Sequence, residues 1–107
     1  METKKAEFSL AQDTAEWLMT QHAGSRSFEP FAATRGIHTM RDAYRVQDRY
    51  NALQAKTRGV TRAGYKIGLT SKAMQSALNI DEPDSGILLD DMFFADGGLV
   101  PTERFIA

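Results

Sequence analysis

The stretch Gly64-Tyr65-Lys66-Ile67-Gly68-Leu69-Thr70-Ser71 is the most informative part of this 107-residue chain. Its two glycines disfavour a helix, and they predict a short strand whose backbone another group can approach closely. Thr70 and Ser71 can cap a following helix, which we expect over residues 72 to 78, with Asn79 at its exit. A lysine therefore stands between two glycines, in a strand that leads into a capped helix.

Turn residues and short apolar runs follow this segment. The sequence Glu82-Pro83-Asp84-Ser85-Gly86 is typical of a turn. Beyond it we expect short strands at residues 86 to 89, 92 to 94 and 99 to 100, with Asp96-Gly97-Gly98 as a hairpin turn.

Two amphipathic helices are predicted upstream of it. Ser9 can cap a first helix that ends at Gly24, because apolar residues recur between them at helical spacing. Thr39 and Asp42 have the spacing of a capping box, and Gly59 can end this second helix. The predicted fold class is α+β, in one domain over residues 1 to 107: two N-terminal helices, then short strands and a short helix.

The composition limits the chemistry of the chain. It has no cysteine, which excludes disulfides, thiolate zinc sites and cysteine nucleophiles, and its two histidines cannot build a His-rich metal site. Carboxylates, lysine and arginine must therefore carry any reaction. No apolar run approaches the roughly 20 residues of a membrane span. The N-terminus lacks the apolar segment of a signal peptide, so we expect no membrane association and a cytoplasmic location.

Charge is unevenly distributed along the chain. Residues 1 to 34 carry a formal charge of −2, residues 35 to 72 carry +7 and residues 73 to 107 carry −6. Such segregation indicates either pairing between the middle and the end of the chain or an anionic partner for the middle segment. Acidic residues interrupt the basic ridge of the second helix, so we expect internal pairing and no nucleic-acid partner. The ridge consists of Arg41, Arg45, Arg49 and Lys56.

Lys66 and the acidic residues after it are the candidates for chemistry. Lys66 supplies a positive charge, and the cluster of Asp81, Glu82 and Asp84 supplies carboxylates for proton transfer or for a hard cation. The alternative is that the glycines only avoid steric clashes, that Lys66 is solvated and that the acidic turn is a solvent-exposed helix cap without a chemical role. Residues 64 to 71 do not match a P-loop, and the acidic residues do not have the spacing of an EF-hand. Lys66 and an acid of the turn could face each other across one cleft.

Three blocks of the sequence resemble a known family. Residues 42 to 47 (DAYRVQ), 64 to 75 (GYKIGLTSKAMQ) and 81 to 94 (DEPDSGILLDDMFF) are similar to the N-terminal part of the 2-keto-4-pentenoate hydratase and 2-oxohept-3-ene-1,7-dioate hydratase family. This family lies within the fumarylacetoacetate-hydrolase-like superfamily. The three blocks occur in the family's order, and the resemblance extends from about Thr39 to Ile106.

The resemblance implies a reaction and roles for particular residues. Family members add water to 2-hydroxy-dienoate acids in the breakdown of aromatic compounds, and they use magnesium or manganese. By resemblance, Lys66 would neutralise negative charge near a bound enolate, and Asp84 would handle a proton or orient water. Leu69, Thr70 and Ser71 would bind the substrate.

The resemblance also stops at an informative place. The family's metal-binding glutamates and its β-roll lie beyond the segment matched here, and no acid of this chain corresponds to those glutamates. We therefore expect no metal site in this chain and no activity from the chain alone, as an N-terminal domain or truncated form of a hydratase. The alternative is a non-catalytic module that self-associates, as a homo-oligomer, or binds a partner. It would use exposed apolar segments such as 87 to 89 and Phe93-Phe94.

Overall fold

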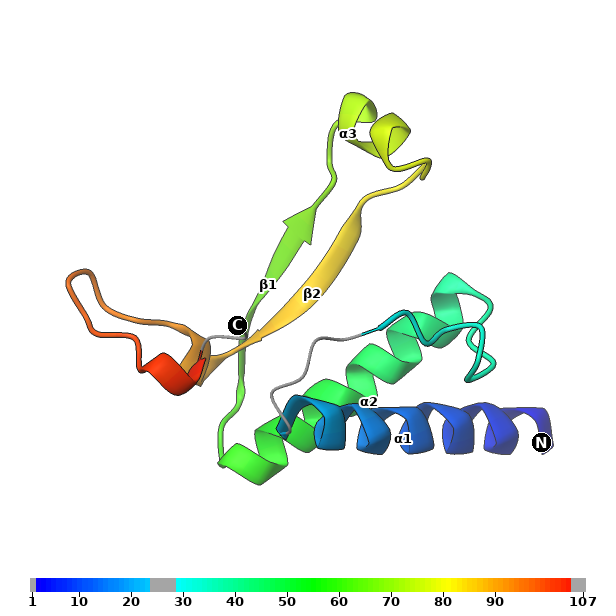
Figure 1. Cartoon of the computed structure of the whole chain (residues 1–107), viewed down its shortest axis with the longest axis horizontal. Coiled ribbons are helices and arrows are strands. Elements are labelled where there is room, and N and C mark those ends of the chain that lie inside the picture. Colours follow the sequence, from blue (N-terminus) through cyan, green and yellow to red (C-terminus); the bar gives the residue numbers. More distant parts are fainter. Residues whose placement is uncertain (1, 24–28, 105–107) are drawn as a thin grey trace.

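A long helix pair and a narrow two-stranded sheet form the computed structural model, which describes residues 2 to 23 and 29 to 104 (Figure 1). The predicted α+β class is confirmed over these residues. The elements in chain order are α1 (Glu2–Ala23), α2 (Met40–Arg58), β1 (Arg62–Gly68), α3 (Lys72–Ala77), β2 (Asp84–Leu89) and the 3-10 turns η1 (Asp90–Met92) and η2 (Thr102–Arg104).

Helices α1 and α2, which we call the helical pair, pack against each other through small residues. Ala11 and Ala15 of α1 are buried, and their small side chains let α2 approach closely. Ala11 forms a core cluster with Val46 of α2 and with Ile37 of the preceding loop. The helical pair thus has a small hydrophobic core of its own.

Two arginines of the basic ridge of α2 contact α1. Arg45 forms an ion pair with Glu7 of α1. The Arg49 Nε donates a hydrogen bond of 2.8 Å to the Gln12 side chain, and its guanidinium lies 5.2 Å from the ring centre of Phe8. Arg45 thus has an acidic partner near the N-terminus, and the contacts of Arg49 are to uncharged groups.

The predicted ends of α2 are confirmed. The Thr39 hydroxyl accepts a hydrogen bond of 3.1 Å from the Asp42 backbone N–H, and Gly59 ends the helix with a φ of 66°. The predicted start of α1 is wrong, because that helix begins at Glu2 and Ser9 lies inside it. Residues 2 to 8 contain no breaker, and contacts to α2 hold this first part in place. Gly24 lies outside the described residues.

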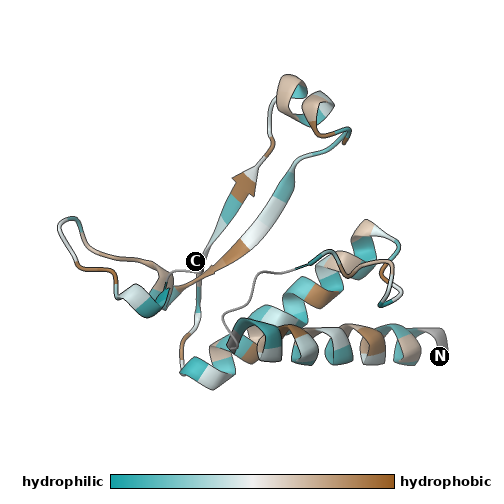
Figure 2. Ribbon diagram, viewed as in Figure 1, coloured by the Kyte–Doolittle hydropathy of each residue, from teal (hydrophilic) through white to brown (hydrophobic). Residues whose placement is uncertain are grey.

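Strands β1 and β2 pair antiparallel, and together with α3 they form a projection, residues 62 to 89, that we call the arm (Figures 1 and 2). In the register, Lys66 lies opposite Gly86, and Gly68 lies opposite Asp84. The radius of gyration of 15.7 Å exceeds the ~13 Å of a compact domain of about this size, because the arm extends away from the helical pair.

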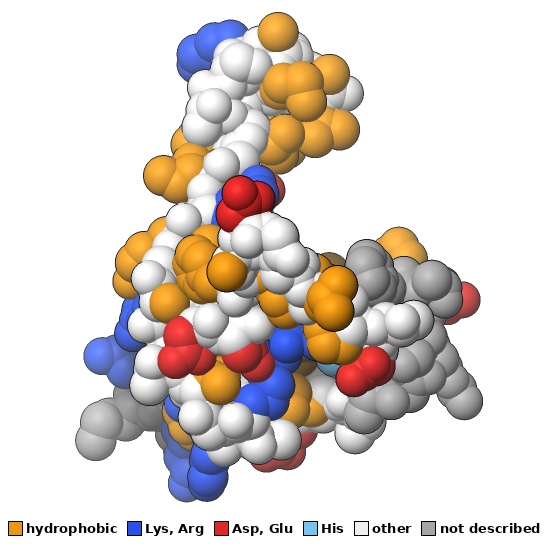
Figure 3. Space-filling view, turned by 90° about the vertical axis from the view of Figure 1, so that its left-hand side faces the viewer, with side chains coloured by type: hydrophobic (Ala, Val, Ile, Leu, Met, Phe, Trp, Pro, Cys, Tyr) orange, Lys and Arg blue, Asp and Glu red, His pale blue; other side chains and the backbone are white. Residues whose placement is uncertain are grey.

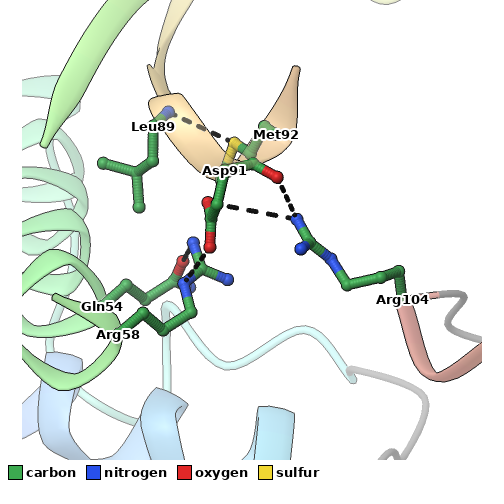
Figure 4. A network of polar contacts seen from close by, with 6 residues as sticks. All are labelled: Gln54, Arg58, Leu89, Asp91, Met92 and Arg104. Atoms are coloured by element: carbon green, nitrogen blue, oxygen red, sulfur yellow. Dashed lines mark hydrogen bonds and ion pairs between the residues drawn. The ribbon is translucent and has the colours of Figure 1, made fainter. Parts of the chain in front are cut away.

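A polar network fixes the base of the arm (Figure 4). Leu89, at the end of β2, is 1% exposed. Just beyond it, the Asp91 carboxylate forms an ion pair of 3.0 Å with Arg58 of α2, and its carbonyl accepts a hydrogen bond of 2.9 Å from Arg104. The basic middle and the acidic end of the chain are therefore paired at this point.

Several details downstream differ from the prediction. The expected strand at 92 to 94 is absent, since Asp90–Met92 forms a 3-10 turn and Phe93 and Phe94 are irregular. The expected strand at 99 to 100 is also wrong. Such short runs form a strand only when a neighbour pairs with them, and none does here among the described residues. The turn at Gly97 is present, with a φ of 79° and a hydrogen bond from Gly98 N–H to Ala95 O.

The predicted turn at 82 to 86 is shorter than expected, because β2 already begins at Asp84. As for membranes, none of the helices in the described ranges is both long and apolar enough to cross a bilayer.

Candidate active site

Lys66 and Asp84 come together over Gly68. Lys66 and Gly68 lie two residues apart on β1 and therefore share one face of the strand. Asp84 lies opposite Gly68 on β2. A Cβ atom added to Gly68 would lie 2.7 Å from the Asp84 Oδ1 and 3.7 Å from the Lys66 Nζ. The ammonium and the carboxylate thus both border the space above a residue without a side chain.

This geometry explains one of the two glycines in the segment. At 2.7 Å an added Cβ would overlap the Asp84 carboxylate, so Gly68 makes room for it. At Gly64 the nearest atom, Phe93 Cζ, would be 3.8 Å away, an ordinary contact. The close approach at Gly68 comes from Asp84 of the same chain.

Lys66 and Asp84 lie side by side on neighbouring strands and do not face each other across a cleft. Both residues are exposed. The ion pairs found within 4.0 Å among the described residues do not include them. Both charged groups therefore stay accessible to a third group placed above Gly68.

Asp84 also borders two clefts between the arm and the start of α2. The larger, of about 340 Å³, includes Leu69 and the residues that lead into β2. The smaller, of about 210 Å³, is shared with α2. The larger is lined by Met40, Leu69, Asn79, Ile80, Asp81, Glu82, Pro83 and Asp84, and the smaller by Met40, Ala43, Tyr44, Gln47, Asp84 and Ser85.

Two side chains of α2 hold the backbone beside Asp84. The Ser85 N–H donates a hydrogen bond of 3.1 Å to the Tyr44 hydroxyl. The Gln47 side-chain amide donates one of 3.2 Å to the Ser85 carbonyl. These bonds satisfy both backbone groups of Ser85 on the outer edge of β2 and fix Asp84 relative to α2. Sequence reasoning missed Tyr44, although it stands in a block that resembles the hydratase family.

Leu69, a predicted substrate-binding residue, has an unusual backbone conformation. Its φ is 54°, in the left-handed region that bulky residues rarely adopt. Its carbonyl accepts a hydrogen bond of 2.9 Å from the Gln75 side-chain amide. The turn out of β1 is thus held by α3, and it places Leu69 in the same cleft as Asp84.

Thr70 and Ser71 are not brought to that cleft. Both are exposed, and neither lines the space around Asp84. The Ser71 hydroxyl accepts a hydrogen bond of 3.2 Å from the Met74 N–H, which confirms the predicted cap of α3. The helix itself, Lys72–Ala77, is shorter than expected by one residue.

The acidic residues of the turn do not assemble a metal site. Within the part of the chain that the structure describes, no group of three or more histidine, cysteine, aspartate or glutamate side chains could hold a metal ion. Asp81, Glu82 and Asp84 are all exposed and spread along the chain leading into β2. The donor set present here does not fit a metal.

Comparison with known proteins places these residues in context. No family model matches the chain. It is 57% identical over 68 residues to the 2-oxo-hept-4-ene-1,7-dioate hydratase of Escherichia coli, a match that covers 64% of this chain and 25% of the relative. It is 38% identical over 92 residues to 2-keto-4-pentenoate hydratase 1 of Dechloromonas aromatica (strain RCB), a match that covers 86% of this chain and 35% of that relative.

A solved structure is similar as well. This is the 4-oxalocrotonate decarboxylase from Pseudomonas putida G7, complexed with magnesium and adipate. The TM-score is 0.62 at 25% sequence identity, and the likeness covers 82% of this chain and 32% of that one.

The fold is therefore part of the fumarylacetoacetate-hydrolase-like fold. Within that class, the resemblance to the 2-keto-4-pentenoate hydratase family is confirmed, and the chain is homologous to its members over most of its own length. It spans between a quarter and about a third of the length of the relatives described here. The match to the Dechloromonas relative covers 86% of the chain, so the matched segment extends over both Lys66 and Asp84.

Proposed function

We propose that the chain is the N-terminal domain, or a truncated form, of a 2-hydroxy-dienoate hydratase of the 2-oxo-heptene-1,7-dioate type. It would serve the breakdown of aromatic compounds in the cytoplasm. The observation that carries this proposal is the meeting of Lys66 and Asp84 over Gly68, in a chain homologous to such hydratases.

Each proposed site residue has a physical role. The Lys66 ammonium would neutralise negative charge that develops on the oxygen of a 2-oxo acid as its enolate forms. The Asp84 carboxylate, next to it, would accept or return a proton, or orient the water that adds to the double bond. Leu69 would contact the substrate in the cleft. Thr70 and Ser71 lie outside that cleft, so we assign them no substrate contact.

A magnesium or manganese ion is expected for the complete family enzyme, and the similar decarboxylase was solved with magnesium. In the complete enzyme such an ion would bind the 2-oxo acid end of the substrate and stabilise negative charge there. The described residues of this chain offer no ligand set for it. None of these residues is therefore assigned to the ion.

The first test is an assay of the purified 107-residue chain. With 2-hydroxypentadienoate and magnesium we expect no hydration, because Lys66 and Asp84 lie on an open surface with no metal ligands beside them among the described residues. Loss of the dienoate absorbance at the rate of a hydratase would contradict this expectation.

A chimera tests the proposed roles directly. The matched segment of the Escherichia coli relative would be replaced by this sequence, and we expect the hybrid to hydrate its dienoate. In it, Asp84→Asn should lower kcat by about 10²-fold or more, as for loss of a general acid or base. Lys66→Met should lower it by about 10²-fold, as for loss of charge stabilisation.

The control in that chimera is Glu82→Gln, which removes a neighbouring exposed carboxylate of the same cleft. It should change kcat by less than the Asp84 variant. An active hybrid that tolerates both Asp84→Asn and Lys66→Met would refute the assigned roles.

A second function is favoured by the apolar surface of the arm. Of the apolar segments predicted to be exposed, Phe93 and Phe94 are 57% and 42% exposed, whereas residues 87 to 89 are not, because Leu89 is buried at the base of the arm. Other exposed apolar side chains are Tyr65 and Ile67 of β1, each 65% exposed, and Met74 and Leu78 at the end of the arm (Figure 3). A non-catalytic module could use this surface to form homo-oligomers. We expect light scattering of the chain to give a mass above that of a monomer, and Ile67→Lys to lower it. A monomer at high concentration would count against self-association.

A further inference from the structure

Gln75 stands out at the end of the arm because it is buried where its neighbours are exposed. Its residue is 5% exposed, whereas every other residue of α3 is exposed. A polar side chain is stable in such a place only when its hydrogen bonds are made. The burial of this amide is therefore explained by the hydrogen bonds that it makes, which an apolar side chain could not make.

Three hydrogen bonds connect Gln75 to the whole turn between the strands. Its side-chain amide donates to the Leu69 carbonyl at 2.9 Å. Its backbone N–H donates to the Ser71 carbonyl at 3.1 Å, and its own carbonyl accepts from the Ile80 N–H at 2.9 Å. One residue thus ties the exit of β1, the cap of α3 and the return toward β2.

The first of these bonds acts on a strained residue. Leu69 has a φ of 54°, a conformation that costs a bulky residue free energy and persists only where its surroundings enforce it. The Gln75 amide is a buried donor, and a hydrogen bond away from water is stronger than an exposed one. The hydrogen bond from the Gln75 amide to the Leu69 carbonyl therefore stabilises the left-handed conformation of Leu69.

Leu69 and Ile80 line the same cleft as Asp84. Leu69 directly follows Gly68, over which Lys66 and Asp84 meet. A change in the Leu69 backbone would therefore move the strand end opposite Asp84. The bonds of Gln75 reach both sides of the cleft.

We propose that Gln75 is a positioning residue of the candidate site, which holds Leu69 in the left-handed conformation and so sets the cleft beside Asp84. Gln75 acts through Leu69 and does not itself contact a substrate. That the cleft serves a substrate rests on the proposed function, whereas the coupling of Gln75 to Asp84 does not.

The test uses the free 107-residue chain and nuclear magnetic resonance. Gln75→Leu removes the donor at similar size, and Ser76→Ala on the same helix is the matched control, since Ser76 is exposed. We expect Gln75→Leu to shift the Leu69 amide and the Asp84 carboxyl carbon resonances. The Ile80 amide keeps its bond to the backbone carbonyl of residue 75. We nevertheless expect its hydrogen exchange to speed up by about tenfold, because loss of the side-chain bond to Leu69 loosens the turn that contains it. Ser76→Ala should do neither.

A rescue experiment separates positioning from packing. Glycine adopts a positive φ without strain, so in a Leu69→Gly background the change Gln75→Leu should barely move the Asp84 resonance. An equal effect in both backgrounds, or no effect on Asp84 in the original chain, would overturn the proposal. Should Gln75→Leu fail to fold, Gln75→Glu keeps the size, replaces the donor by an oxygen and carries the same expectations.

These readouts do not involve hydration. An inactive chimera would refute the proposed function and leave the coupling of Gln75 to Asp84 standing. Conversely, an active chimera combined with an unmoved Asp84 resonance in Gln75→Leu would refute only the positioning role.

Discussion

The helical pair buries apolar side chains between its helices, whereas the arm leaves large apolar side chains exposed. The pair joins two long helices around Ala11, Ala15 and Val46, and it adds polar bonds between the helices. The arm exposes large apolar side chains on β1 and α3, and its sheet has two strands. An isolated two-stranded sheet is marginal in water, so the arm depends on its base and on the contacts from α2.

The helical pair contains the buried core, and the arm carries the candidate site residues. Lys66, Leu69 and Asp84 all lie on the arm, while the buried cluster lies between α1, α2 and the loop before α2. The helical pair acts as a scaffold, and through Tyr44 and Gln47 it fixes one point of the arm.

Val46→Asp should be the most damaging change to the helical pair. Val46 is 5% exposed in the core cluster, and an unpaired carboxylate there would lower the free energy of unfolding by about 3 kcal/mol or more. Chemical denaturation followed by circular dichroism measures this loss. Ala52→Asp, at an exposed position of the same helix, should cost far less; equal losses would mean that the core cluster is not where stability lies.

Leu89→Ala should detach the arm from its base. Leu89 is 1% exposed, so the cavity left behind should cost about 2 to 4 kcal/mol of unfolding free energy. Ile67→Ala, on the same sheet but 65% exposed, should cost about 0.5 kcal/mol or less. If the Ile67 variant were the more harmful in denaturation, the exposed face of β1 would have to be covered in solution.

The two helix caps give a direct comparison of the two regions. Thr39 caps α2 and Ser71 caps α3 with similar hydrogen bonds of 3.1 and 3.2 Å. Thr39→Ala should lower global stability by about 1 kcal/mol. Ser71→Ala should instead speed hydrogen exchange within the arm and leave the denaturation midpoint almost unchanged. A global loss from Ser71→Ala would show that arm and helical pair unfold as one unit.

The smallest effect concerns Tyr50 of the helical pair. Burial is the main cause that raises its pKa above 10.0, against opposing contributions from the Gln54 hydrogen bond and the Arg58 charge. The folded pKa exceeds the unfolded one, so this contribution is fully present below pH 10 and is lost as the pH rises through the folded pKa. Denaturation between pH 8 and 11 should show a slight decline that Tyr50→Phe removes. An unchanged decline would assign it to another group.

Local signals predicted the regular elements well. The capping pair at Thr39, the glycine after α2 and the cap at Ser71 are short-range features, because a cap bonds a backbone group three residues away. The start of α1 was wrong since contacts to α2 support residues that carry no cap signal. The strand expected at 92 to 94 failed because apolar composition cannot create a pairing neighbour.

The candidate site was predicted in its residues and not in its arrangement. Resemblance to the hydratase family singled out Lys66 and Asp84, but nothing local indicated that they would meet over Gly68 on neighbouring strands. Tyr44 and Gln75 were not assigned to the site at all, because their partners lie in the backbone of other segments. Hydrogen bonds to a carbonyl or an N–H leave little trace in residue type.

By itself the sequence determined the α+β class, the ends of α2, the cap of α3, the lack of cysteine chemistry and the relationship to the hydratases. These follow from composition, from spacing over a few residues and from matched blocks. The tertiary structure alone decided the register that sets Asp84 against Gly68, the left-handed turn at Leu69 and its tie to Gln75. The physical reason is that these features depend on which distant segments pack together, and each is stable only once its partner is in place.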